Sequence, residues 1–195
     1  MQKFIAITIL SLVFHSTAYA ETPPVKLPGS IAMHIGQTHY EHPVRLLHPY
    51  LDFWHMKGPL AEKAALKALK KRFADVGNCS APANVVLLLE PHIFYNVHLG
   101  VFHGEFIARA YVNSTEEPTY ENSLTYIKKQ AQQLGNLGIK PDVYMEKAYE
   151  KAMDKIVKKL ETDKAFLATL DKPKMDNPKS ICDALDKLPP GKIYY

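Results

Sequence analysis

The sequence is poor in cysteine, lacks a strong excess of charge of either sign and has no long apolar run beyond its first twenty residues. It has 195 residues, with 24 Lys and Arg against 20 Asp and Glu, 47% hydrophobic residues and two cysteines. This composition excludes disordered and collagen-like chains and fits one globular domain. The formal net charge of +4 is too small to favour nucleic acid or an anionic membrane as a partner.

Common enzyme motifs are also absent. The chain contains no Gly-x-Ser-x-Gly elbow, phosphate loop, dinucleotide glycine fingerprint, His-Glu-x-x-His helix or Cys-x-x-Cys pair. Each of these motifs positions a catalytic nucleophile, a bound phosphate or a metal ion for a particular kind of reaction. Their absence favours a non-enzymatic protein, with an unrecognised hydrolase as an alternative. Such a hydrolase would need a histidine beside at least two of these carboxylates in one pocket: Glu41, Asp52, Glu90 and Glu105.

Residues 1–20 are typical of a signal peptide. They carry a positive charge at Lys3, an apolar run over 4–14 and small residues in Ala18-Tyr19-Ala20, so the mature chain should begin near Glu21. The run is about eleven residues long, whereas a bilayer span needs roughly twenty. No later run reaches that length. We therefore expect an exported mature chain, periplasmic or secreted, without a transmembrane segment.

Both cysteines, Cys79 and Cys182, lie in the part that we expect to be exported. An oxidising compartment favours one disulfide between them, and two buried free thiols are the alternative. Closing a loop of about 100 residues stabilises a chain by at most roughly 4–5 kcal/mol on the chain-entropy model. The bridge would tether a proline-rich tail, residues 171–195, to a single domain formed by residues 21–170.

The first half of the mature chain predicts strands around one helix. Alternating apolar residues predict a strand over 30–37, and the Pro-, His- and aromatic-rich residues 38–58 predict a long ordered loop. Apolar residues at three- and four-residue spacing predict a helix over 59–76. A compact apolar run predicts a central strand over 84–89. Extended segments over 93–97 and 101–112 then predict an antiparallel hairpin that turns near Gly100.

Beyond this hairpin we expect helices, one over 119–134 and a longer one over 141–170. The element order predicts an α+β fold, in which a small, mainly antiparallel sheet in β-α-β-β order is covered by helices and followed by a helical extension. On the longer helix, Glu146, Glu150 and Asp154 recur at four-residue spacing. They predict a solvated charged face paired with lysines of the same helix.

Histidines and aromatic residues are concentrated in the predicted loop. Imidazoles that converge there could bind zinc or copper, although their spacing matches no structural zinc motif and scattered, hydrogen-bonded histidines are the alternative. The candidate ligands are His39, His42, His48 and His55. The aromatic side chains could form a partner patch, because they offer large contact area at low entropic cost, or they could plug the end of the core. These residues are Tyr40, Tyr50, Phe53 and Trp54.

The strand, amphipathic helix and two-strand run over residues 30–112 carry a resemblance to a known group. The two-strand run reads Val85-Val86-Leu87-Leu88-Leu89, Ile93-Phe94-Tyr95-Asn96 and Phe102-His103-Gly104-Glu105-Phe106. This layout, under half of the chain, resembles small periplasmic proteins of the YajG and TolB amino-terminal-domain kind. It departs from them in lacking a lipid-anchored cysteine and in adding the segment from Thr119. The resemblance implies an accessory of the bacterial cell envelope that binds or assembles with a protein or another envelope component and has no active site.

Overall fold

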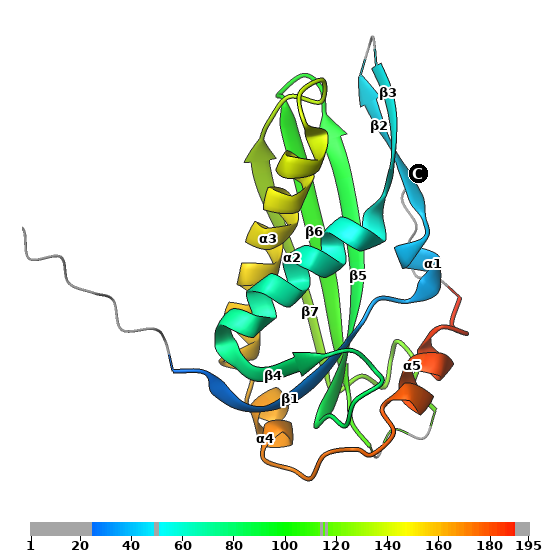
Figure 1. The fold of residues 1–195 in the computed structure, drawn as a ribbon, viewed down its shortest axis with the longest axis vertical. Coiled ribbons are helices and arrows are strands. Elements are labelled where there is room, and N and C mark those ends of the chain that lie inside the picture. Colours follow the sequence, from blue (N-terminus) through cyan, green and yellow to red (C-terminus); the bar gives the residue numbers. More distant parts are fainter. Residues whose placement is uncertain (1–24, 49–50, 114, 116, 190–195) are drawn as a thin grey trace, which may run out of the picture.

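The computed structural model describes residues 25–48, 51–113, 115 and 117–189, so the expected leader lies outside the described residues. A five-stranded sheet forms the centre of the molecule, in the order β4-β1-β5-β6-β7 (Figure 1). Its strands are β1 (Leu27–His34), β4 (Phe73–Gly77), β5 (Val85–Asn96), β6 (Val101–Tyr111) and β7 (Thr125–Leu134). β1 runs parallel to both β4 and β5, whereas β6 is antiparallel to β5 and β7.

A hairpin and several helices complete the described structure, which confirms the α+β class. The hairpin pairs β2 (Pro43–His48) with β3 (Leu51–Met56) in antiparallel register. The helices are α1 (Gln37–Tyr40), α2 (Lys57–Arg72), α3 (Pro141–Leu160), α4 (Lys164–Leu170) and α5 (Lys179–Leu185). In the described part of the chain, no helix has both the length and the apolar character needed to cross a membrane.

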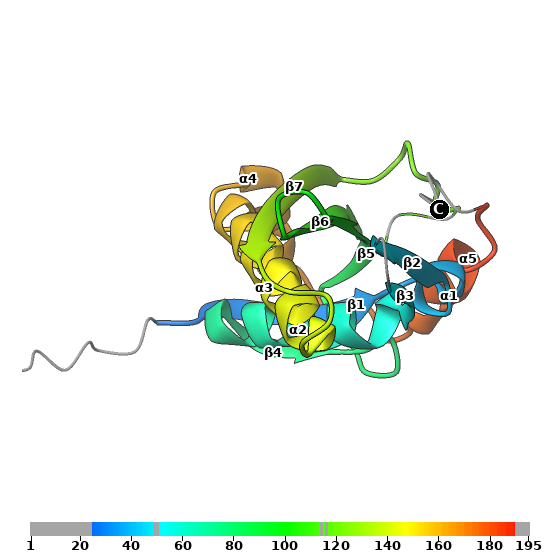
Figure 2. The ribbon, with the colours of Figure 1, turned by 90° about the horizontal axis from the view of Figure 1, so that it is seen from above.

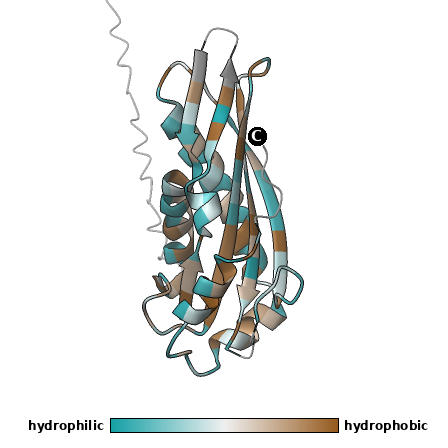
Figure 3. Ribbon diagram, turned by 90° about the vertical axis from the view of Figure 1, so that its right-hand side faces the viewer, coloured by the Kyte–Doolittle hydropathy of each residue, from teal (hydrophilic) through white to brown (hydrophobic). Residues whose placement is uncertain are grey.

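The two faces of the sheet are covered by different structures. The first face packs against α2, α3 and α4 through a large apolar core that includes Leu87, Phe106 and Tyr149. The second face packs against α5 through a smaller core that includes Val86 and Ile181 (Figure 2). Alternate residues of one strand supply both cores, because successive strand side chains point to opposite faces. In Figure 3, hydrophobic residues follow the long central strands, whereas the helices beside them mix hydrophobic and hydrophilic residues.

The prediction of a loop over residues 38–58 was wrong. This segment contains all of α1 except Gln37, together with the β2–β3 hairpin, and α2 begins within it. Val44 and Leu46 are buried while Arg45 between them is exposed, which is the two-residue period of a half-buried strand. Pro43 suggested a break in structure, but it stands at the first position of β2, where a strand tolerates proline.

The predicted helix over 59–76 ends earlier than expected. α2 stops at Arg72 and the chain continues as β4 from Phe73, whose backbone is extended. Phe73 and Val76 are buried, as their spacing predicted, but they lie on an edge strand that pairs in parallel with β1. The sheet therefore contains two short parallel pairings, β4–β1 and β1–β5, beside the longer antiparallel pairings β5–β6 and β6–β7.

The prediction of a helix over 119–134 was also wrong, because residues 125–134 form β7. Thr125, Ile127 and Ala131 are buried and fall on one parity of the strand. The remaining positions are mostly Lys and Gln, which have good helix propensity. Pairing with β6 along the whole length of β7 overrides this local preference.

Two other boundaries differ from expectation. The segments 84–89 and 93–97 belong to one strand, β5, which runs through Pro91. Proline is tolerated there because β1 pairs with β5 only as far as Leu88, which leaves β6 as the neighbour in the sheet. Part of the predicted tail, residues 171–195, also forms a helix, α5.

The helix predicted over 141–170 is two helices, α3 and α4. The break lies at Asp163, whose side chain accepts hydrogen bonds from the backbone N–H groups of Ala165 and Phe166. An aspartate in this position caps the start of a new helix.

The acidic residues of α3 pair with α2 and not, as predicted, with lysines of their own helix. The two helices lie side by side with the same four-residue repeat, so opposite charges meet across the interface. The Nζ–carboxylate distances are 2.7, 2.5 and 3.7 Å for Lys63–Glu146, Lys67–Glu150 and Lys71–Asp154.

Candidate functional site beside the disulfide

A cleft of about 330 Å³ lies where the end of β1 meets α5. β1, α1, α2, the loop after β4 and α5 all contribute to its walls. Several of its side chains have acid–base or sulfur chemistry: His34, Tyr40, Glu62, Cys79, Cys182 and Asp186.

The disulfide between Cys79 and Cys182 forms part of this cleft. It joins the loop after β4 to α5, with the two Cα atoms 6.5 Å apart and a sequence separation of 103 residues. Cys182 is 2% exposed and belongs to the core of the second face, whereas Cys79 is half-buried. Cys79 is therefore the more accessible of the two sulfur-bearing residues.

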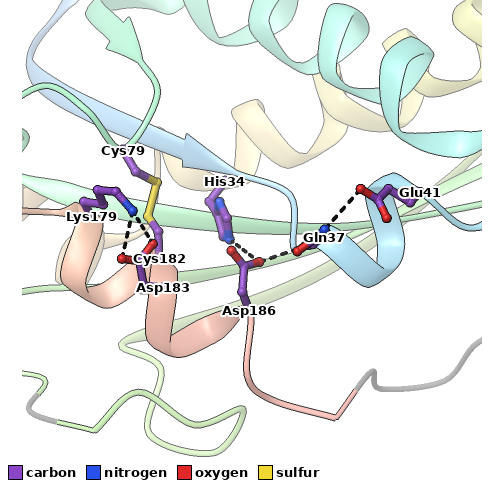
Figure 4. A network of polar contacts seen from close by, with 8 residues as sticks. All are labelled: His34, Gln37, Glu41, Cys79, Lys179, Cys182, Asp183 and Asp186. Carbon is purple, nitrogen blue, oxygen red and sulfur yellow. Dashed lines mark hydrogen bonds and ion pairs between the residues drawn. A yellow bond between two sulfur atoms is a disulfide. The ribbon is translucent and has the colours of Figure 1, made fainter.

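His34, the last residue of β1, is fixed beside this disulfide by a carboxylate. Its Nε2 lies 3.0 Å from Oδ1 of Asp186, which follows α5 directly. The same oxygen accepts a hydrogen bond from the backbone N–H of Gln37, also at 3.0 Å. Figure 4 shows His34 with the disulfide on one side and Asp186 on the other. A carboxylate held in this way fixes the orientation of an imidazole.

A ring nitrogen of His34 and both cysteine sulfurs lie within 4.8 Å of one another. The sulfurs are bonded to each other, and the thiolate is the form of cysteine that binds a metal. The oxidised site is therefore an acid–base group next to a disulfide and not a set of metal ligands.

Other polar side chains of the cleft pair with one another. The Tyr40 hydroxyl donates to Oε2 of Glu62 at 3.0 Å, and this hydrogen bond, followed by burial, raises the pKa of Tyr40. On α5, Nζ of Lys179 lies 2.7 Å from Oδ1 of Asp183. The phenol of Tyr40 is engaged in this hydrogen bond, whereas His34 contributes an imidazole, a group that can both accept and donate a proton.

A second group of ionisable residues, the buried polar cluster, comprises His39, Lys57, Glu90, His92 and Arg109. Glu90 forms an ion pair with Arg109, and its other oxygen lies 3.8 Å from Nε2 of His39. The rings of His39 and His92 meet edge to face, with centroids 5.6 Å apart. The cluster therefore places histidines, cations and one carboxylate around the second face.

Burial suppresses the charge of the two histidines in this cluster. Desolvation, helped by the positive charge of Lys57, lowers the pKa of His39 to about 4 and that of His92 to about 3. Desolvation also lowers the pKa of Lys57 to about 8. Lys57 is 1% exposed, and its Nζ has no hydrogen-bond partner among the described residues. Both histidines are neutral at pH 7, whereas Lys57 keeps most of its charge.

The carboxylates considered for a hydrolase are dispersed among the described residues. A cavity of about 10 Å³, room for about one water molecule, holds Glu90 beside His39 but none of the other three. Glu41 accepts a hydrogen bond from Gln37, and Glu105 pairs with Lys128 at 3.2 Å. The side chain of Asp52 lies outside the described part of the chain.

The histidines predicted as metal ligands occupy different surroundings. His39 belongs to the buried polar cluster, and His55 pairs with Asp142 at the start of α3. Burial, followed by the charge of Lys57, lowers the pKa of His42. The side chain of His48 lies outside the described residues. Among the described donors, none of these histidines joins a group of three ligand atoms within 4.8 Å. A zinc or copper site stays a prediction.

The predicted aromatic patch is divided between surface and core. Trp54 is 62% exposed. Phe53 and Tyr40 are partly buried and pack against the core of the first face. Tyr50 lies outside the described residues.

Sequence reasoning did not single out His34 and Asp186. Asp186 follows Cys182 by four residues, which places the two on neighbouring positions of one helical turn. That spacing was a usable signal for Asp186. The contact with His34 spans 152 residues, and nothing in the local sequence indicates it.

Comparisons with known proteins assign no family. No protein-family model and no curated protein sequence matches the chain. Among solved structures, a DUF330 protein from Xanthomonas campestris is similar with a TM-score of 0.47 and 11% identity, over 75% of this chain and 87% of that chain. A candidate lipoprotein from Caulobacter crescentus gives a TM-score of 0.36 and 13% identity, over 73% of this chain and 93% of that chain. Likeness at this level assigns no function, and the resemblance to YajG and TolB stays a prediction.

Proposed function

We propose that the mature chain is an exported, non-enzymatic accessory protein of the bacterial cell envelope that binds another envelope protein. The leader pattern of residues 1–20 supports export to the periplasm. The disulfide between Cys79 and Cys182 fits the same compartment, because such bonds persist where the environment is oxidising.

The outward face of the β2–β3 hairpin is the proposed binding surface. Trp54 and Met56 on β3 are 62% and 44% exposed. Arg45, which faces Trp54 across the hairpin, places its guanidinium 5.9 Å from the centre of the indole ring. Trp and Arg are the residues most enriched among those that dominate binding energy. Exposure of Trp54 beside Arg45 is the observation that carries the proposal.

The inward face of the hairpin holds this surface in place. Val44 and Leu46 are buried in the core of the first face, and Phe53 packs against it. His55 also points inward and pairs with Asp142 of α3. A surface fixed before binding loses little conformational entropy when a partner docks.

The chemistry of the surface specifies the kind of partner. Its outward residues, Pro43, Arg45, Trp54 and Met56, are exposed, and Arg45 is the charged member. A complementary protein surface would offer an apolar pocket for the indole and an acidic side chain for the guanidinium.

Site-specific crosslinking tests the binding surface. A photoreactive amino acid at position 56, which leaves Arg45 and Trp54 intact, should capture one discrete envelope protein in living cells, and Trp54→Ala should abolish the capture. Phe94→Ala is the matched control, because Phe94 is also an exposed aromatic, at 51%, but lies on β5. Capture that survives Trp54→Ala, or is lost equally with Phe94→Ala, would contradict the proposal.

Export is tested separately by the intact mass of the protein isolated from its host. The expected mass is that of a chain beginning near Glu21 with one disulfide. A chain that retains Met1, or one with two alkylatable thiols, would remove the export part of the proposal.

A further inference from the structure

We propose that the disulfide between Cys79 and Cys182 is a thiol–disulfide exchange site that a dithiol reduces, with His34 moving the proton. The inference rests on the juxtaposition of disulfide, imidazole and carboxylate in the cleft. It is independent of the binding surface on the hairpin.

The cleft offers an incoming thiol a route to the disulfide, and Cys79 is the more exposed of its two residues. Both cysteines line the cavity of about 330 Å³, but Cys79 is half-buried whereas Cys182 is 2% exposed. Exchange requires a thiolate to reach a disulfide sulfur, and its rate depends on which sulfur is accessible. Attack should therefore occur at Cys79, with Cys182 as the leaving group.

His34 is placed to serve both sulfurs. A ring nitrogen lies within 4.8 Å of each sulfur, and Nε2 is held by Asp186 at 3.0 Å. A protonated imidazole beside a thiolate lowers the pKa of that thiol, and a thiol of lower pKa leaves faster. Asp186 keeps the ring oriented through this contact, which makes it a positioning residue.

The exchange balances in two steps. A thiol of the reductant gives its proton to His34 and attacks Sγ of Cys79; the bond between Cys79 and Cys182 breaks, and its electron pair stays on Cys182. His34 then passes the proton to that thiolate. The second thiol of the reductant, ionised by solvent, attacks its own sulfur in the mixed disulfide and releases Cys79, which takes a proton from water. The reductant becomes a disulfide, and both cysteines become thiols.

The contacts around α5 do not depend on the disulfide alone. Ala83 and Met175 exchange backbone hydrogen bonds of 3.2 and 2.7 Å. Ile181 and Leu185 pack in the core of the second face, and Asp186 also holds Gln37. Reduction should therefore leave the thiol of Cys182 next to His34 and Asp186, so that the site can be oxidised again without refolding.

The rate of reduction of the folded, oxidised protein by dithiothreitol tests the proposal. Thiols are alkylated at timed intervals between pH 5 and pH 8 and counted by mass. His34→Gln should slow reduction at least about tenfold and flatten the pH profile, because acid–base catalysis is lost. Asp186→Asn should shift the profile with a smaller loss of rate. His98→Gln, in the turn between β5 and β6, at the opposite end of β5 from the loop that carries Cys79, is the control and should match the native protein. A native rate and pH profile in His34→Gln would overturn the proposal.

Two further measurements separate exchange in the folded protein from exposure by unfolding. Phe106→Ala should weaken the fold while changing the rate of reduction little; rates that follow the free energy of unfolding across the variants would overturn the proposal.

With an excess of a small monothiol, the mixed disulfide trapped by acid should be found on Cys79. A mixed disulfide mainly on Cys182 would contradict the assigned order of attack.

Discussion

The two faces of the central sheet are stabilised in different ways. The first face is covered by fully buried residues such as Phe106 and Tyr149, and α3 approaches it so closely that a Cβ on Gly104 would lie 2.7 Å from the backbone carbon of Ala148. The second face has a smaller apolar core, a disulfide and the buried polar cluster. Because its side chains are closely packed, the stability of the first face depends on how well their shapes fit together. The second face depends in addition on redox state and pH.

The largest effect should come from the first face. Phe106 is fully buried, with its ring centroid 5.1 Å from that of Tyr149. Phe106→Ala should lower the free energy of unfolding by about 3–5 kcal/mol, because it removes apolar burial and leaves a cavity. Denaturant unfolding measures the loss. Val143→Ala, at a 43% exposed position of α3, should change it little, and equal losses in the two variants would contradict this account.

Removal of the disulfide should have the next largest effect. Replacing both Cys79 and Cys182 with serine removes a crosslink between residues 103 positions apart. The free energy of unfolding should fall by about 2–4 kcal/mol. Hydrogen exchange should show the loss of protection concentrated in α5, whereas α3 keeps its protection. Uniform loss over both helices would mean that the two faces unfold as one unit and not separately.

Acid should weaken the second face before the first. The pKa of His39 is about 4 in the folded protein against an ordinary value of 6.5. Above pH 6.5 the ring is neutral in both states. As pH falls from 6.5 towards 4, the unfolded chain takes up a proton that the folded chain refuses, so stability falls. Between pH 7 and pH 4.5, the free energy of unfolding of His39→Gln should therefore fall by about 2 kcal/mol less than that of the native protein.

The pH series has a direct control. His98→Gln changes a histidine in the turn between β5 and β6 and should leave the acid-dependent loss as it is in the native protein. Unfolding curves at matched ionic strength compare the three proteins. A native loss in His39→Gln would show that burial of this imidazole does not set the acid sensitivity.

Features that are local in sequence were predictable, and features that depend on distant pairing were not. The turn at Gly100, whose φ is +59°, follows a compact apolar run and was predicted with its hairpin. β7 was assigned as a helix because its Lys and Gln residues favour one, and only β6 makes it a strand. The candidate site follows the same rule. The disulfide could be predicted, because the chain has only two cysteines and both lie in the part that we expect to be exported. The contact between His34 and Asp186 could not, because it joins residues 152 positions apart.

The smallest effect should come from the ion pairs between α2 and α3 over the first face. Nζ of Lys63 lies 2.7 Å from Glu146, with the lysine side chain 65% exposed. In a double-mutant cycle, Lys63→Ala and Glu146→Ala should show a coupling of about 0.2–1 kcal/mol that shrinks in high salt, because exposed pairs are screened. Lys147, on the same helix as Glu146, provides the control partner and should give no coupling with Lys63. Coupling above about 2 kcal/mol between Lys63 and Glu146 would mean that charge, as well as packing, holds the first face together.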